Sequence, residues 1–127
     1  MNKIILSSAS FLGMLAIILG AFAAHGLEKL VDEFAISTFK TGVQYQMYNA
    51  LFLFVVGIIN TVSINTKKTI YFLVLFGVLF FSGSIYGLAT NNLSSFDFKT
   101  IALVTPLGGL LFILAWFWFG VSIIRSK

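Results

Sequence analysis

The chain has 127 residues, of which 59% are hydrophobic and only 9% are charged, and its formal net charge is +4. Soluble domains carry about 25% charged residues, so this composition excludes an ordinary water-soluble protein and predicts one that lies in a membrane. The sequence has no cysteine, which excludes disulfides, thiolate catalysis, iron–sulfur clusters and cysteine-ligated zinc. The basic residues are scattered at the ends of apolar stretches, so we expect contact with acidic lipid headgroups and no binding of nucleic acid.

Four long apolar stretches account for most of the chain. They cover residues 4–24, 43–64, 69–89 and 101–124. A helix rises about 1.5 Å per residue, so about 20 residues cross a hydrocarbon core of about 30 Å. We therefore predict an all-α fold, an integral membrane four-helix bundle that forms a single transmembrane domain over residues 1–127.

The first stretch also has the features of a secretory signal, because the small-residue pattern Ala21-Phe22-Ala23 follows an apolar run. That run is longer than the roughly 7–15 residues usual for a signal, and only Lys3 provides positive charge before it. We predict that the segment is retained as the first span.

Lysine and arginine in the short connections indicate the orientation. If the amino terminus is cytoplasmic, five basic residues lie on that side: Lys3, Lys67, Lys68, Arg125 and Lys127. The other side has three basic residues and all four acidic ones: Lys29, Lys40, Lys99, Glu28, Asp32, Glu33 and Asp97. Cytoplasmic loops carry the excess of Lys and Arg, so we predict that both termini are cytoplasmic.

A segment between the first two spans has clear amphipathic periodicity and predicts a short interfacial helix at about 27–40. Its apolar side consists of Leu27, Leu30, Val31, Phe34, Ala35 and Thr38. Its polar side consists of Glu28, Lys29, Asp32, Glu33, Ser37 and Lys40. The simplest role is to carry the chain along the membrane surface with the apolar side on lipid or on the bundle. The alternative is that the acidic face binds a partner.

His25 is the only histidine and lies where the first span meets this segment. Alone it cannot form a two-histidine haem or metal site, and a metal would require Glu28, Asp32 or a second copy of the chain. We expect its ring to bond the backbone or a polar residue of the second span; the alternative is a proton-handling or ligand role. Gly20 belongs to a ladder of small residues spaced by four, which lets another helix approach closely.

The second span begins with an unusually polar run, Gln44-Tyr45-Gln46-Met47-Tyr48-Asn49. Unsatisfied polar groups are costly in lipid, so we expect these side chains to turn toward other helices or toward the headgroups. The candidate polar cluster comprises His25, Gln44, Tyr45, Gln46, Tyr48, Asn49, Ser82, Tyr86 and Thr105. Hydrogen bonds between helices are the simplest interpretation; the alternative is a pocket for a small, quinone-like molecule.

The third and fourth spans contain small residues that predict close helix packing. In the third span these are Gly83 and Gly87, four apart, and in the fourth they are Gly108 and Gly109. Pro106 is either the first helical residue with Thr105 as its cap, or it bends a helix that begins near Thr100. We favour the second geometry, because the first leaves barely enough residues to cross.

The two tryptophans, Trp116 and Trp118, lie near the carboxyl-terminal end of the fourth span. Tryptophan is enriched at membrane–water interfaces. We predict that both lie at the cytoplasmic interface, above Arg125 and Lys127.

Four short motifs together carry a resemblance to a known family. They are Gly20–Leu27, Tyr45–Leu51, Phe81–Tyr86 and Thr105–Gly109. In this order they resemble the small membrane proteins of domain-of-unknown-function family 423, which are similar to eukaryotic transmembrane protein 256. The family has no established activity, and the resemblance implies a four-span protein of the bacterial cytoplasmic (inner) membrane.

Two positions depart from the family pattern, which usually has Gly where this chain has Ala23 and His where it has Asn49. Asparagine forms hydrogen bonds but is not an ordinary haem ligand or proton carrier. We therefore expect no two-histidine metal chemistry in this chain.

Three functions remain open from sequence alone. We favour an accessory or assembly subunit of a larger membrane protein complex, and the alternative is a homo-oligomeric channel or transporter for a small solute. The third is an intramembrane enzyme or redox carrier that uses His25, Tyr45 and Tyr48. Since the sequence offers no nucleophile–base or carboxylate pair, we predict no enzymatic activity, no catalytic residues, no cofactor and no metal. The expected partners are the lipid bilayer and other membrane subunits or further copies of the chain.

Overall fold

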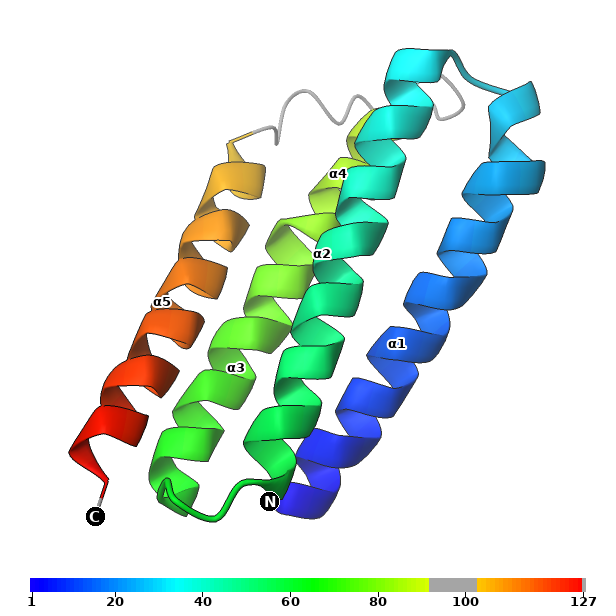
Figure 1. Ribbon diagram of the computed structural model, residues 1–127. Coiled ribbons are helices and arrows are strands. Elements are labelled where there is room, and N and C mark those ends of the chain that lie inside the picture. Colours follow the sequence, from blue (N-terminus) through cyan, green and yellow to red (C-terminus); the bar gives the residue numbers. More distant parts are fainter. Residues whose placement is uncertain (92–102, 127) are drawn as a thin grey trace.

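The computed structural model describes residues 1–91 and 103–126, and all regular structure in these ranges is helical. The elements are α1 (Asn2–His25), the short 3-10 helix η1 (Leu27–Lys29), α2 (Glu33–Ile58), α3 (Ile64–Phe80), α4 (Ser82–Ala89) and α5 (Val104–Arg125). They form one elongated bundle in which α1 and α5 lie at opposite sides, with α2 and the α3–α4 pair between them (Figure 1). The two chain termini lie at the same end of the bundle (Figure 1).

The bundle packs mainly through three helix pairs, α1 with α2, α3 with α5, and α2 with α4. The larger core lies toward the end with the termini and contains Ile5, Ala9, Phe52, Leu53, Val56, Ile70, Tyr71, Val74 and Ala115. A smaller core at the other end contains Ala23, Leu27, Phe39 and Ala89. The all-α fold predicted from the sequence is therefore confirmed.

Three helical segments of the described chain are long and apolar enough to cross a membrane. They are Asn2–Lys29, Ile64–Ala89 and Val104–Arg125. Helix α2 is not among them, although its 26 residues would reach about 39 Å, because Gln44, Gln46 and Asn49 interrupt its apolar sequence. The count of four spans therefore stays a prediction.

The separate interfacial helix predicted over 27–40 is wrong in its boundaries. The chain turns after η1, and α2 begins at Glu33 and continues without a break through the predicted start of the second span. The cause is Asp32, whose extended backbone interrupts the helix and whose side chain accepts a hydrogen bond of 2.8 Å from the amide of Ala35, a standard helix cap. The residues of the predicted apolar side do not share one environment, since Leu27 is fully buried whereas Phe34 is 81% exposed.

The connection between the second and third helices also differs from its predicted position. Helix α2 ends at Ile58, not at residue 64, and α3 begins at Ile64, where the Ser63 side chain accepts a hydrogen bond of 3.2 Å from the Thr66 amide. This cap extends the helix over sequence that was expected to form the loop. Lys67 consequently lies within α3.

The predicted third span, 69–89, is interrupted at Phe81, which separates α3 from α4. The Ser84 hydroxyl donates a hydrogen bond of 2.5 Å to the carbonyl of Phe80, and such bonds to the preceding turn bend helices. Gly108 of α5 lies against the same point, where an added Cβ atom would be 2.8 Å from the carbonyl carbon of Phe80. The interruption therefore coincides with the closest approach of α5.

Helix α5 begins at Val104, with Pro106 in its first turn. The favoured prediction of a helix that begins before the proline is confirmed, since Val104 precedes Pro106. The predicted start near Thr100 lies outside the described residues, and Leu103 is not helical. In the first turn an amide has no partner within the helix, so the missing N–H of proline breaks no helical hydrogen bond. No bend is needed at this position.

Candidate functional site

Gln46 joins three helices through its side-chain amide. It is 3% exposed, its Nε2 donates to the Leu12 carbonyl of α1 at 2.8 Å, and its Oε1 accepts from the Tyr86 hydroxyl of α4 at 2.6 Å. Both polar atoms of this buried amide are thus satisfied within the protein. Two members of the predicted polar cluster, Gln46 and Tyr86, are brought together as expected.

Helix α4 makes two further polar contacts that involve the predicted cluster. The Ser82 hydroxyl, fully buried, donates to the Gly42 carbonyl of α2 at 2.7 Å. The hydroxyls of Ser84 and Thr105 are hydrogen-bonded to each other across α4 and α5. These contacts hold α4 between α2 and α5.

Asn49 links α2 to α5 in the middle of the bundle. Its Nδ2 donates to the Tyr45 carbonyl at 2.8 Å, and its Oδ1 accepts from Nε1 of Trp116 at 3.0 Å. The Trp116 ring is also stacked on Phe52, with centroids 4.3 Å apart and an interplanar angle of 13°. Asn49 thus gives the indole N–H an acceptor within the bundle, while the interfacial position of Trp116 stays a prediction.

Four members of the predicted cluster stay outside this network. His25 and Gln44 are exposed, and within the described residues their side chains make no hydrogen bond or ion pair. The same holds for the phenolic hydroxyls of Tyr45 and Tyr48, whose side chains are 41% and 50% exposed. His25, at the end of α1, is not brought to Asn49.

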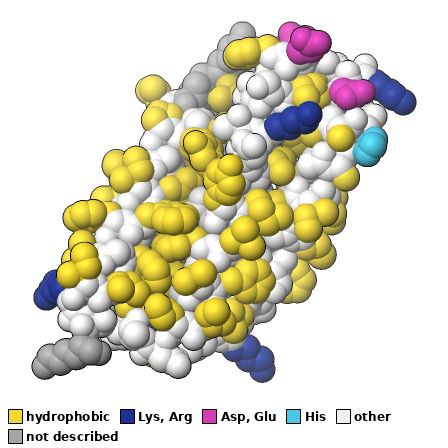
Figure 2. Space-filling view, in the orientation of Figure 1, with side chains coloured by type: hydrophobic (Ala, Val, Ile, Leu, Met, Phe, Trp, Pro, Cys, Tyr) yellow, Lys and Arg dark blue, Asp and Glu magenta, His cyan; other side chains and the backbone are white. Residues whose placement is uncertain are grey.

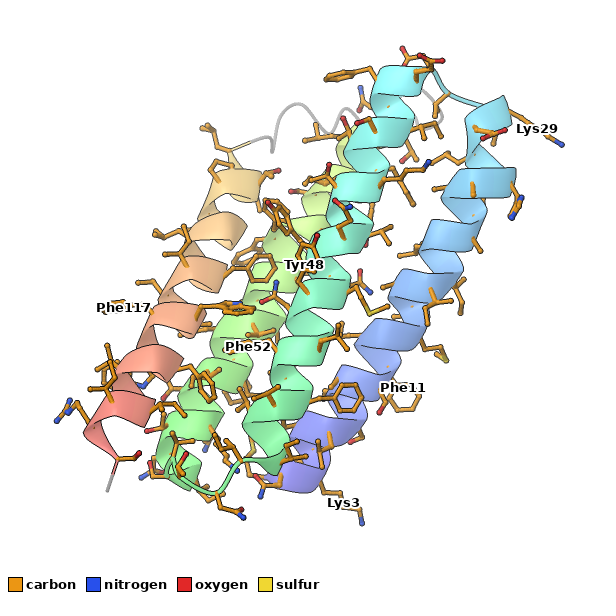
Figure 3. All side chains as sticks on the ribbon, in the orientation of Figure 1. Lys3, Phe11, Lys29, Tyr48, Phe52 and Phe117 are labelled. Carbon is orange, nitrogen blue, oxygen red and sulfur yellow. The ribbon has the colours of Figure 1, made fainter. Side chains whose placement is uncertain are left out.

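The two tyrosines line a groove between α2 and α5. Because α2 packs mainly on α1 and α4 while α5 packs mainly on α3, the two helices leave a cavity of about 520 Å³ and a second of about 430 Å³ between them. We call these together the aromatic groove; it is lined by Tyr45, Tyr48, Asn49, Leu51, Phe52, Val55, Phe81, Gly109, Phe112, Ile113, Trp116 and Phe119. Figure 3 shows Tyr48 and Phe52 between the two helices, whereas Phe117 and Phe11 point away from the bundle.

The aromatic groove lies near the middle of the bundle along its long axis. A Cβ atom on Gly13 would be 3.9 Å from the Cβ of Ala50 and 4.0 Å from the Sδ of Met47, so these residues of α2 are level with Gly13. Gly13 is about 12 residues, or about 18 Å, from either end of α1. Tyr48, which lies between Met47 and Ala50 in the sequence, is therefore also about 18 Å from the level of either end of α1.

The predicted packing residues differ in how tightly they are enclosed. Gly108 lies against the backbone of Phe80 and Phe81, and Gly20 is in ordinary contact with Val43. Gly87 is buried and Gly109 lies beside the Phe81 ring, but Gly83 and Pro106 are exposed. Sequence reasoning missed three close approaches, at Gly42, Gly57 and Gly77, where an added Cβ would be 2.6–2.8 Å from a neighbouring side chain.

Sequence reasoning also missed two polar contacts of α1 with α3. The ammonium of Lys67, 2% exposed, donates to Oδ1 of Asn2 at 3.0 Å, and the hydroxyls of Ser8 and Tyr71 are 2.6 Å apart. No short-range pattern connects residues so distant in sequence. Within the described residues, no group of three or more His, Cys, Asp or Glu could hold a metal ion.

Comparison with known proteins identifies one family model and several membrane proteins that are similar to this chain. The family model described as protein of unknown function (DUF423) matches residues 19–109. A UPF0382 membrane protein of Staphylococcus saprophyticus is 39% identical over 115 residues, which cover 90% of this chain and 91% of the relative. The UPF0382 membrane protein YwdK of Bacillus subtilis is 36% identical over 125 residues, 97% of this chain and 98% of the relative. A UPF0382 membrane protein of Haemophilus influenzae is 33% identical over 115 residues, 91% and 89% of the two chains. No solved structure matches the chain.

Proposed function

The chain belongs to the DUF423 family of membrane proteins of unknown function, and on this premise we propose that it is an accessory subunit of a larger membrane protein complex. The observation that carries the proposal is the aromatic groove, with the phenolic hydroxyls of Tyr45 and Tyr48 at its edge and no partner for either within the described residues. We infer that this groove receives one transmembrane helix of another subunit. That helix carries a hydrogen-bond acceptor at the level of the tyrosines.

Lipid alone is a poor occupant of the groove. Acyl chains offer no hydrogen-bond acceptor, and a polar group left unsatisfied in hydrocarbon costs several kcal/mol. Headgroups have acceptors, but they lie at the membrane surface, and Tyr48 is eight residues of α2, or about 12 Å, beyond Lys40. A carbonyl or a polar side chain of a partner helix is available at that depth.

The shape of the groove also fits a helix. Its lining extends from Tyr45 to Val55 on α2 and from Gly109 to Phe119 on α5, which is about 15 Å, or about three helical turns. The wall is aromatic apart from a few aliphatic side chains, Asn49 and Gly109. Gly109 is the small residue of the wall, and small residues let the backbone of a neighbouring helix approach closely in membranes.

We propose that α2 also crosses the membrane, despite its polar residues, and so brings the number of spans to four. The buried amide of Gln46 is bonded to α1 and α4, and that of Asn49 to α5 and to the Tyr45 carbonyl of α2 itself. Helix α2 therefore need not present these amides to lipid, which removes the main energetic objection to its crossing. Residues 33–40 would then lie at the headgroup level, where the 81% exposed Phe34 is accommodated by lipid.

We further propose that the protein lies in the bacterial inner membrane with both termini in the cytoplasm. Lys3 and Lys29 lie at opposite ends of the bundle (Figure 3). The end that holds the termini has Lys3, Lys67, Lys68 and Arg125, and the excess of Lys and Arg marks the cytoplasmic side.

The test is site-specific photocrosslinking in native membranes, with a photoreactive amino acid at Ile113 in the aromatic groove or at Ile17 on the outer face of α1. The two side chains are 65% and 66% exposed, so they are matched in access to lipid. The proposal predicts a crosslink from position 113 to a transmembrane segment of a different protein, and none from position 17. It also predicts that Ile113→Trp, which fills the groove, abolishes association with that protein, while Ile17→Trp does not.

Two outcomes contradict the proposal. Crosslinks from position 113 to a second copy of the chain favour the homo-oligomeric channel or transporter instead. Crosslinks to lipid alone from both positions mean that the groove is simply part of the lipid-facing surface.

A further inference from the structure

The end of the bundle that holds the termini has an uneven charge distribution. Its charged side chains within the described residues are all basic: Lys3, Lys68 and Arg125 are exposed, and Lys67 is buried. The described acidic residues, Glu28, Asp32 and Glu33, belong to the opposite end, where Figure 2 shows Asp and Glu beside the histidine. A surface with this charge attracts anions.

A polar cavity opens at this basic end, between the start of α3, the preceding turn and the last turns of α5. Its volume is about 470 Å³, and its lining includes Arg125, Trp118 and five hydroxyl side chains, with no carboxylate among the lining residues. The hydroxyls belong to Thr61, Ser63, Thr66, Ser122 and Ser126. We call this cavity the basic pocket.

Several hydrogen-bond donors in the basic pocket are not engaged elsewhere. Arg125 makes no ion pair, and the hydroxyls of Thr61 and Ser122 make no hydrogen bond, within the described residues. The Ser63 hydroxyl donates to the Thr66 hydroxyl, and the Ser126 hydroxyl donates to the Ile123 carbonyl, so these three of the five hydroxyls are engaged within the protein. A guanidinium with neighbouring free hydroxyls is a donor set that suits a phosphate group, which arginine binds in a two-pronged geometry.

The surroundings of the basic pocket indicate that this phosphate belongs to a lipid. Trp118 lines it, and tryptophan prefers the level of the headgroups. Next to Arg125, Ile124 is 83% exposed, and Phe117 on the same helix is 67% exposed. These exposed apolar side chains are on the helix that carries Arg125 and can contact acyl chains.

We propose that the basic pocket binds the phosphate headgroup of an anionic phospholipid. Arg125 makes the charge-assisted contact with the phosphate, and Thr61 and Ser122 donate to its free oxygens. Trp118 and the exposed side chains of α5 contact the glycerol and acyl region. The inference is independent of the aromatic groove, which lies in the middle of the bundle.

The test is native mass spectrometry of the full chain in mild detergent with added phosphatidylglycerol or phosphatidylcholine. Both lipids have a phosphate, but only the first is an anion overall. We expect retention of phosphatidylglycerol over phosphatidylcholine, and a loss of that retention by about tenfold in Arg125→Gln, which corresponds to about 1.4 kcal/mol for the lost charge-assisted contact. Ser122→Ala should weaken retention by a smaller factor.

Matched controls distinguish binding in the basic pocket from general electrostatic attraction of the lipid to the basic end of the bundle. Lys3→Gln and Lys68→Gln each remove one charge from the same end of the bundle but lie outside the lining of the basic pocket, so they should leave retention unchanged. Equal losses in these variants and in Arg125→Gln would overturn the proposal, and so would equal retention of the two lipids. Competition by inorganic phosphate at millimolar concentration would also overturn it, because a free ion and not a lipid would then be the ligand. Unchanged circular dichroism of Arg125→Gln establishes that the variant is folded.

Discussion

Replacing Gln46 by Leu should destabilise the protein far more than the same replacement at Gln44, two residues away. Gln46→Leu removes the hydrogen bonds to the Leu12 carbonyl and the Tyr86 hydroxyl. In membranes each such bond contributes about 0.6–1.7 kcal/mol, and the partly buried Tyr86 hydroxyl left without an acceptor adds a penalty, so we expect a total loss of about 2–4 kcal/mol. Gln44 is exposed and unbonded within the described residues, so Gln44→Leu should change stability by less than about 0.5 kcal/mol.

The assay is reversible unfolding of the reconstituted protein by titration with a denaturing detergent, followed by circular dichroism. Tyr86→Phe completes a double-mutant cycle with Gln46→Leu, and the expected coupling between the two side chains is about 0.6–1.7 kcal/mol. A coupling of zero, or equal effects of the two glutamine replacements, would refute the reasoning that buried polar side chains hold α1, α2 and α4 together.

Three further predictions use the same assay or simple spectroscopy. Gly108→Ala should destabilise the bundle by about 1–3 kcal/mol or more, because the new Cβ meets the backbone at Phe80 and Phe81. Gly83→Ala should have almost no effect, because its Cβ would be in ordinary contact with the Val78 carbonyl oxygen at 3.9 Å; equal effects would contradict the packing. Asp32→Ala should lower stability by about 1 kcal/mol through loss of the cap of α2 and speed hydrogen exchange in its first turn; unchanged exchange would show that the cap does not hold this end. In a Trp118→Phe protein, the fluorescence of Trp116 should resist quenching by aqueous iodide, and strong quenching would instead place the indole at the membrane surface.

The sequence predicted the helices well because their signal is local. An apolar run of about 20 residues has few alternatives to a helix in a membrane, and the all-α fold follows from that constraint. The helix ends were predicted less well, since they depend on single caps. Asp32 and Ser63 each start a helix at a point where hydrophobic periodicity indicated another boundary.

The candidate polar cluster was predicted as a group, but its internal pairing was not. Gln44 and Gln46 belong to the same polar run, yet only Gln46 faces α1 and α4, and the sequence contains no information on where those helices lie around α2. Trp116 illustrates the same limit, because its acceptor, Asn49, is on another helix. Which side chains pair between helices depends on how the helices are arranged in space. That polar side chains in a membrane are hydrogen-bonded at all follows from the lipid environment alone.

In the arrangement we propose, α2 crosses the membrane beside the other helices, with its polar side chains turned inward. The most direct measurement is labelling of single engineered cysteines in intact cells with a membrane-impermeant reagent, which is clean because the chain has no native cysteine. Lys29→Cys, before α2, should be labelled from outside, while Asn60→Cys, after α2, and Ser126→Cys, after α5, should be labelled only when the membrane is opened. Labelling of positions 29 and 60 from the same side would show that α2 does not cross, and would contradict the account.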